Sequence, residues 1–273
     1  MIGESESIFR LAGNASSHVG LYRSHNEDNF FFDGYINENS LPIAELSSDF
    51  QIISNYWHCF AVFDGIGGGE HGELASLLAA QKFRSTLSNQ SLHKSNVDQT
   101  AKLAFLDANR EIVMQNKLSL FGTTGTAVFT DGYQFKVFSL GDSRAYLFRN
   151  HELFQLTRDQ TLATIKMELG IYNMNDPQIE RDKHVLTEFI GKDTTLDGIR
   201  PTESQWYDFL HEDYLLLCSD GLYDMCTETE IQTIFSRHQS PATITKVLIN
   251  SAMQSGGSDN ITCIVLEKVR TFG

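Results

Sequence analysis

The sequence predicts a globular fold that mixes β-strands with α-helices, arranged in one large domain or in two. Apolar residues make up 41% of the 273-residue chain and aromatic residues 11%, which is typical of a folded protein. Short runs rich in Phe, Val, Ile and Leu recur along the chain, and stretches with helical spacing separate them. These observations favour a packed mixture of strands and helices.

The predicted strands are short apolar runs bounded by turn residues. They cover residues 8–13, 28–33, 57–63, 123–130, 133–140, 144–149, 214–218 and 261–267. Asp131-Gly132 separates two of these runs and predicts a hairpin with a two-residue type I′ turn. Residues 34–56 interrupt the pattern as a polar excursion between two strands.

The two longest helices are predicted at 70–87 and 97–117, where apolar residues recur at helical spacing. In the second helix, Leu103, Leu106 and Val113 are expected to share a face.

Two further helices are predicted from their N-terminal signals. Thr227 and Glu230 fit a capping box. Ser240 and Pro241 fit the N-cap and first position of a last helix that runs to about residue 254.

Charge and composition narrow the class of protein. The formal net charge of −14 argues against a nucleic-acid or anionic-membrane partner. No run of 18 apolar residues predicts a membrane span, so we expect a soluble, cytoplasmic monomer. The four cysteines form no CxxC pair, and we expect buried, reduced thiols rather than a zinc site.

Acidic residues recur where apolar runs meet turns. They are Glu27, Asp28, Asp64, Asp142, Asp220 and Asp259. Each Asp-Gly turn alone is ordinary turn chemistry, but strand ends far apart in sequence can converge in space. Crowded carboxylates raise one another's pKa unless a positive charge lies between them. A hard divalent cation with oxygen ligands is the simplest such charge.

The type of metal and of reaction follows from the residues around the aspartates. None of the nine histidines lies in an HExxH or HxH arrangement, which favours Mg²⁺ or Mn²⁺ over Zn²⁺. Two such ions can share a bridging water and lower its pKa toward about 7, which suits the hydrolysis of phosphate monoesters. The sequence has no GxSxG motif and no P-loop. Gly67-Gly68-Gly69 could bind phosphate through backbone amides, or it could form a turn that lets Asp64 face the site. Of these two interpretations, the turn is favoured.

Eight motifs resemble, in order, those of metal-dependent protein phosphatases of the protein phosphatase 2C type. They are RSHNED (23–28), VFDGIGG (62–68), FGTTGTAVF (121–129), SLGDSRAYLFR (139–149), LTRDQT (156–161), HVLTEFIG (184–191), LLLCSDGLYD (215–224) and SDNITCIVLE (258–267). One motif alone would be weak evidence, but eight motifs in the same order are highly specific. The match runs from about residue 8 to residue 268.

The resemblance implies an α+β fold, a four-layer α/β/β/α sandwich of two antiparallel sheets flanked by helices. It implies a single catalytic domain over residues 1–273, of the bacterial type, with a flap at about 157–204. That stretch is expected to be helical first and loop-like afterwards, with Gly170 as a helix stop. The activity implied is that of a Mg²⁺- or Mn²⁺-dependent phosphoserine and phosphothreonine phosphatase.

The resemblance also implies roles for the acidic residues. Asp64 would bridge two metal ions, with the Gly65 carbonyl as a further ligand. Asp220 and Asp259 would complete the shell of the first ion, and Glu27 would act through water on the second.

Three more roles are implied at the same site. Asp28 would orient the nucleophilic water, and Asp142 with Asp220 would hold a third, weaker ion. Arg23 would bind the substrate phosphate through its guanidinium. The alternative interpretation of Arg23 is a solvated charge on the surface. Asn260 is expected to support the loop.

The sequence departs from the family pattern at several positions. Ile66 stands where many eukaryotic members have a histidine proposed as the general acid, so a metal-bound water or another group would supply the proton. Gln160 and His184 replace a common histidine and asparagine of the flap, which bears on substrate preference. The excursion at 34–56 is longer than in a minimal bacterial member.

The partners implied are phosphorylated proteins, including targets of a serine/threonine kinase of the same cell. Two alternatives remain open. One is a catalytically silent member that acts as a binding module, although every expected carboxylate is present. The other is a phosphatase of small phosphate esters, which would have the same metal centre.

Overall fold

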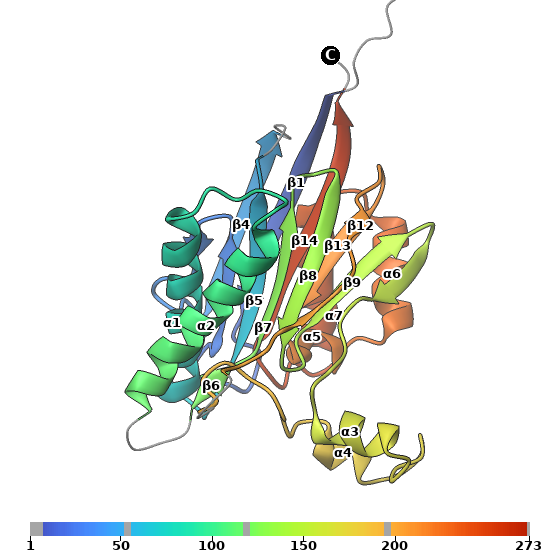
Figure 1. The fold of residues 1–273 in the computed structure, drawn as a ribbon. Coiled ribbons are helices and arrows are strands. Elements are labelled where there is room, and N and C mark those ends of the chain that lie inside the picture. Colours follow the sequence, from blue (N-terminus) through green and yellow to red (C-terminus); the bar gives the residue numbers. More distant parts are fainter. Residues whose placement is uncertain (1–7, 52–55, 117–120, 194–197, 272–273) are drawn as a thin grey trace, which may run out of the picture.

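The computed structural model describes residues 8–51, 56–116, 121–193 and 198–271, and within them two antiparallel sheets form the centre of the molecule (Figure 1). Residue 117 of a predicted helix and residues 52–55 of the predicted excursion lie outside this range. Among the described residues, no helix is both long enough and apolar enough to span a bilayer.

The first sheet has the strand order β10-β9-β13-β14-β1-β4 within the described residues. Its strands are β1 (Ile8–His18), β4 (Ile43–Gln51), β9 (Arg144–Arg149), β10 (Glu152–Gln155), β13 (Tyr214–Cys218) and β14 (Ile261–Thr271). β1 and β14 pair along their whole lengths, from Ile8 opposite Thr271 to His18 opposite Ile261. The first and last strands are therefore neighbours inside this sheet.

The second sheet has the order β11-β8-β7-β5-β2-β3, again for the described part of the chain, with β6 beside β5 and β12 beside β8. Its strands are β2 (Asp28–Phe32), β3 (Tyr35–Ile36), β5 (His58–Ile66), β6 (Gly122–Thr123), β7 (Gly125–Thr130), β8 (Gln134–Leu140), β11 (Thr202–Glu203) and β12 (Tyr207–Asp208).

Helices cover the outer face of each sheet (Figure 1). On the second sheet lie α1 (Glu70–Ser88) and α2 (Val97–Gln115). On the first sheet lie α5 (Asp220–Tyr223), α6 (Glu228–Arg237) and α7 (Pro241–Gln254). The predicted four-layer order of helices, sheet, sheet and helices is confirmed.

The middle of β5 is apolar at successive positions because both of its faces are covered. In β5, Cys59, Ala61 and Phe63 pack against α1 and α2, while Phe60 and Val62 pack against the first sheet. Successive side chains of a strand point to opposite faces, so a strand between two apolar layers needs apolar residues at every position.

The polar excursion predicted at 34–56 is wrong, because the stretch contains β3 and the nine-residue edge strand β4. Ala44, Leu46 and Phe50 of β4 face the core between the sheets, whereas Glu45, Ser47 and Asp49 are exposed. An edge strand with one solvated face carries polar residues at alternate positions, and this alternation hides it from a search for apolar runs.

The hairpin between β7 and β8 is confirmed, but its two-residue type I′ turn is wrong. Thr130 pairs with Phe135, so the loop is longer than two residues. Within the turn dipeptide only Gly132 has a positive φ, +81°, whereas type I′ needs two such residues. The Asp131 carboxylate instead accepts the backbone N–H groups of Tyr133 and Gln134, both at 2.9 Å.

The sequence predicted where the helices begin better than it predicted which of their side chains are buried. The Thr227–Glu230 capping box and the Ser240 cap of α7 are confirmed. On the predicted face of α2, Leu103 and Leu106 are only partly buried. The apolar side chains of α2 that are buried include three alanines. They are Val97, Ala101, Ala104, Phe105, Ala108 and Ile112. Alanines let α2 approach its neighbours closely, which counting large apolar residues does not detect.

Between β10 and β11 lies a segment whose two helices stand apart from the sandwich in Figure 1, whereas its Ile190 and Ile199 pack on the core. It contains only two short helices among its described residues, α3 (Leu162–Glu168) and α4 (Ile179–Asp182), so the predicted helical content was too high. Gly170, at φ +68°, follows the end of α3 as predicted. The residues 157–193 are called the α3–α4 segment below.

Candidate active site

The predicted carboxylates lie at one end of the sandwich, where both sheets stop. Asp28 begins β2 and lies opposite Asp64 near the end of β5. Asp220 begins α5, separated by one residue from the end of β13, and Asp259 precedes β14, the strand that pairs with β13. The register of both sheets therefore gathers side chains that are up to about 230 residues apart in sequence.

The carboxylates are close enough to disturb one another's ionisation. Burial, followed by the charges of neighbouring carboxylates, raises the pKa of Asp64 and of Asp142 well above the ordinary value. The same causes raise the pKa of Asp28 to about 7 and that of Asp220 to about 6. Asp64 and Asp220 keep part of their surface exposed, so an ion could reach them from solvent.

The protein's own cations leave this repulsion uncompensated. Arg23 lies at the rim, with Nη2 2.7 Å from Asp259 Oδ2 and Nη1 4.0 Å from Glu27 Oε1. Its charge does not prevent the rise in the pKa of Asp28 and Asp64. A buried set of hard oxygen donors that lacks positive charge fits a hard divalent cation.

Hydroxyl groups hold the Asp28 carboxylate and the Asp64 backbone in place. Ser219 donates through Oγ to Asp28 Oδ2 at 2.7 Å, and the same Oγ accepts the N–H of Thr262 at 3.0 Å. Asp64 donates its backbone N–H to Thr124 Oγ1 at 3.0 Å. Sequence reasoning missed these positioning residues, although Ser219 and Thr124 both lie inside motifs that carry the resemblance.

Two glycines allow the start of α1 to approach the site. A Cβ on Gly65 would lie 2.1 Å from the Gly72 carbonyl oxygen, and a Cβ on Gly72 would lie 1.9 Å from Glu27 Oε2. Glu27 Oε1 in turn accepts the N–H of Gly69 at 2.8 Å. Because the Glu27 carboxylate binds this amide, the glycine run acts as a turn around Glu27 rather than as a phosphate cradle.

Asn260 organises the loop that carries Arg23 and Glu27. Its Nδ2 donates to the carbonyl oxygens of Val19 at 2.9 Å and His25 at 3.0 Å, and its Oδ1 accepts the Glu27 N–H at 2.8 Å. The predicted supporting role of Asn260 is confirmed by these contacts.

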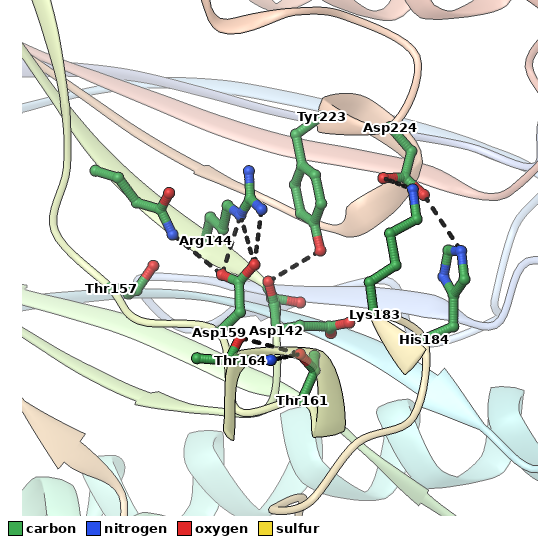
Figure 2. A network of polar contacts seen from close by, with 12 residues as sticks. Asp142, Arg144, Thr157, Asp159, Thr161, Thr164, Lys183, His184, Tyr223 and Asp224 are labelled. Carbon is green, nitrogen blue, oxygen red and sulfur yellow. Dashed lines mark hydrogen bonds and ion pairs between the residues drawn. The ribbon is translucent and has the colours of Figure 1, made fainter. Parts of the chain in front are cut away.

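A separate polar network lies beside Asp142 (Figure 2). Arg144 binds Asp159 through Nε at 3.0 Å and Nη2 at 2.7 Å, and its guanidinium lies 3.7 Å from the Tyr223 ring centroid. The Tyr223 hydroxyl donates to the Asp142 carbonyl oxygen at 3.2 Å. This network holds the Asp142 turn, and no separate signal in the sequence predicted it.

Gln160 acts on the same turn. Its Oε1 accepts the Gly141 N–H at 2.8 Å, and its backbone carbonyl accepts the Thr187 N–H at 2.8 Å. It is buried, so its departure from the family pattern bears on the position of Asp142.

His184 is exposed and lies near the carboxylates. Its Nε2 is 4.0 Å from Asp224 Oδ2, and ligand atoms of His184, Asp220 and Asp224 all lie within 4.8 Å of one another. Lys183 Nζ lies 3.2 Å from Asp224 Oδ1, so two consecutive residues connect the α3–α4 segment to the end of α5 (Figure 2).

The structure thus brings together all of the residues predicted for the site. They are Arg23, Glu27, Asp28, Asp64, Gly65, Asp142, Asp220 and Asp259. Their individual roles as ligands or catalytic groups stay predictions.

The raised pKa values predict how metal-free stability depends on pH. Asp28 and Asp220 have folded-state pKa values of about 7 and about 6, above the ordinary 3.8, so the folded state binds more protons than the unfolded state. This stabilisation is complete below about pH 4 and is lost as the pH rises through about 6 to 7. Other groups also titrate across the acid range. The test therefore compares the unfolding midpoint of the wild type with that of a variant that lacks one of these carboxylates.

Thermal unfolding in chelator should therefore show the midpoint of the wild type falling relative to that of Asp220→Asn between about pH 5 and about pH 8. Mn²⁺ should raise the wild-type midpoint more at the higher pH, because ions and protons compete for the same oxygens. Parallel pH curves for the two proteins would contradict the carboxylate repulsion.

Known proteins resemble this chain in sequence and in fold. The sequence profile described as protein phosphatase 2C matches residues 21–166. The serine/threonine phosphatase stp of Listeria monocytogenes is 29% identical over 255 residues, which cover 91% of this chain and 92% of the relative.

Two solved structures extend the comparison. The crystal structure of the Mycobacterium tuberculosis serine/threonine phosphatase PstP/Ppp superposes with a TM-score of 0.73 at 26% identity, covering 95% of this chain and 98% of the other. A structure of a PstP catalytic domain in complex with two manganese ions has the same TM-score and identity, covering 96% and 99%.

Proposed function

This chain belongs to the protein phosphatase 2C family, and we propose that it hydrolyses phosphoserine and phosphothreonine in proteins at a centre of two divalent metal ions. It is an enzyme of the serine/threonine phosphatase class. The observation that carries the metal centre is the cluster of carboxylates whose pKa values are raised by burial and by one another.

The ions proposed are Mn²⁺ or Mg²⁺, since every donor is a hard oxygen. Asp64 would lie between the two ions, with the Gly65 carbonyl as a further ligand. Asp220 and Asp259 would hold the first ion, and Glu27 the second through water. Bound ions would lower the pKa of water and balance the charge of the phosphate ester.

The remaining site residues bind and orient. Arg23 is proposed to bind the substrate phosphate, because a guanidinium matches two phosphate oxygens at once. Its side chain is about half exposed at the rim, where a substrate can reach it. Asp28 is held by Ser219 and would orient the attacking water from its fixed position.

A third, weaker ion is proposed between Asp142 and Asp220, as the resemblance implies. His184 and Asp224 extend the donor set beside Asp220, because their ligand atoms lie within 4.8 Å of its carboxylate. An ion bound there would tie the α3–α4 segment, the proposed flap, to the rest of the site. Phosphorylated proteins, including targets of a serine/threonine kinase of the same cell, are the proposed partners. The monomeric state and the cytoplasmic location stay predictions from the sequence.

The proposed function is tested by phosphate release from a phosphothreonine peptide. Release should require Mn²⁺ or Mg²⁺, stop when a chelator is added and return when the ion is restored in excess. A folded protein that releases no phosphate from peptides or from p-nitrophenyl phosphate with either ion would contradict the proposal. Hydrolysis of the small ester without any peptide hydrolysis would instead favour a phosphatase of small phosphate esters.

A further inference from the structure

The loop that carries Arg23 is pinned to the loop before β14. Gly20 has φ +83°, and a Cβ at this residue would lie 2.2 Å from the Asp259 carbonyl oxygen. The next residue, Leu21, donates its backbone N–H to the Gly257 carbonyl oxygen at 2.8 Å. Together with the Asn260 contacts described above, these fix the backbone before Arg23 in one conformation.

This fixed loop holds large apolar side chains in solvent. Leu21 is 60% exposed and Tyr22 is 78% exposed. The Leu21 Cγ and the Met253 Sδ both lie close to Gly257, at 3.2 and 3.1 Å from the position that a Cβ on this glycine would take.

A second methionine continues this surface. The Sδ of Met225 lies 3.5 Å from the position that a Cβ on Gly256 would take, next to Gly257. Met225 and Met253 are partly buried and pack on the core beneath α7. Leu21, Tyr22, Met225 and Met253 are called the Leu21 surface below.

Single exposed apolar residues are common on proteins, but two features set the Leu21 surface apart. It ends at Arg23, the proposed phosphate-binding residue, and its backbone is held in place before any ligand binds. Methionine side chains adapt to different apolar partners, which suits a site that accepts varied sequences.

Reach and charge define what would bind there. Consecutive Cα atoms lie about 3.8 Å apart, so Leu21 and Tyr22 start within about 7 Å of the Arg23 backbone. An extended peptide advances about 3.3–3.6 Å per residue, so its side chains within about three positions of the phosphorylated residue can reach this surface. Acidic neighbours such as Asp259 and Glu27 disfavour acidic flanking residues.

We infer that the Leu21 surface binds a large apolar side chain of the protein substrate, located within three residues of the phosphoserine or phosphothreonine. This inference rests on the proposed function and adds a substrate preference to it. The occupant is a segment of the phosphoprotein.

The test compares phosphothreonine peptides of equal length and charge. One set has two leucines directly after the phosphothreonine, a second has them directly before it, and a third has serines at all four positions. With Mn²⁺, one leucine set should have a KM about tenfold lower than the serine set, at similar kcat. Uniform binding of a flanking group lowers KM and leaves kcat unchanged.

The double variant Leu21→Asn with Met253→Gln should remove this preference and leave the hydrolysis of p-nitrophenyl phosphate unchanged within about twofold. Leu210→Asn is a matched control, because Leu210 is 48% exposed and follows β12, which pairs with the start of β8 rather than with the end next to Asp142. It should keep the preference.

Equal KM values for the three wild-type peptide sets would overturn the inference, as would a leucine preference that survives the double variant. The inference would also be overturned if the wild type and the double variant both hydrolyse p-nitrophenyl phosphate normally but neither prefers one peptide set to another. If the wild type hydrolyses neither the peptides nor p-nitrophenyl phosphate, the result would instead contradict the proposed function. A concentration-dependent dimer that Leu21→Asn abolishes would assign the surface to a second copy of the chain and overturn the inference.

Discussion

Replacing Asp64 with asparagine is expected to lower kcat/KM for a phosphothreonine peptide by at least about 1000-fold, equivalent to about 4 kcal/mol of transition-state stabilisation. Burial raises the pKa of Asp64 most, and the charges of Asp220, Asp28, Asp142 and Asp259 raise it further, so its carboxylate lies within reach of all four. A neutral amide at this point removes the charge that would hold two ions. Initial rates with saturating Mn²⁺ measure the effect.

The same substitution should leave the metal-free protein at least as stable as the wild type. The asparagine side chain would keep the shape of the aspartate while it relieves the repulsion that raises the pKa of its neighbours. In chelator, the unfolding midpoint should stay equal or rise, and the rise caused by Mn²⁺ in the wild type should be lost. Asp208→Asn, at an exposed position on β12 far from the site, is the control and should behave as the wild type.

A variant at position 64 that is fully active would contradict the role of Asp64. A variant that unfolds in chelator would contradict the repulsion argument, because it would give the carboxylate a structural role instead.

Replacing Gly65 with alanine is expected to destabilise the protein by about 3 kcal/mol or more, in the upper range for overpacked sites. The added Cβ would lie 2.1 Å from the Gly72 carbonyl oxygen and 2.6 Å from that of Glu27. Both contacts are with backbone, so relief requires a shift of α1 or of the Glu27 loop. Urea unfolding in chelator measures the loss, and Mn²⁺ binding should weaken with it.

Gly72→Ala is the matched control for this effect. Its Cβ would meet Glu27 Oε2 at 1.9 Å, which is the end of a flexible side chain that can move away. We therefore expect a smaller loss of stability and a weaker Mn²⁺ affinity, since Glu27 would be displaced. Equal and small losses for both variants would contradict the close approach of α1 to β5.

The sequence predicted the buried parts of this fold because their side-chain pattern is dictated by burial on both faces. β5 and β13 are apolar at nearly every position, and such runs are visible without a structure. β4 was missed because only one of its faces is buried, and the most buried face of α2 was not identified because alanine forms much of it.

The motifs predicted the carboxylates that the structure brings together, since each of them lies beside a turn or at a strand end. The groups that position these carboxylates were missed because their partners are distant in sequence. Ser219 reaches Asp28 across 191 residues, and Asn260 reaches Glu27 across 233. Such contacts follow from strand register, which local patterns do not specify.

The central claim is that these carboxylates form one centre for divalent ions, and a crystal structure with Mn²⁺ tests it most directly. Anomalous diffraction from manganese should show two strong peaks, with Asp64 between them and Asp220 and Asp259 beside one of them. A peak between Asp142 and Asp220 should be weaker and should appear at higher Mn²⁺ concentration. The absence of any manganese peak among these carboxylates, in crystals grown at neutral pH with excess Mn²⁺, would contradict the account.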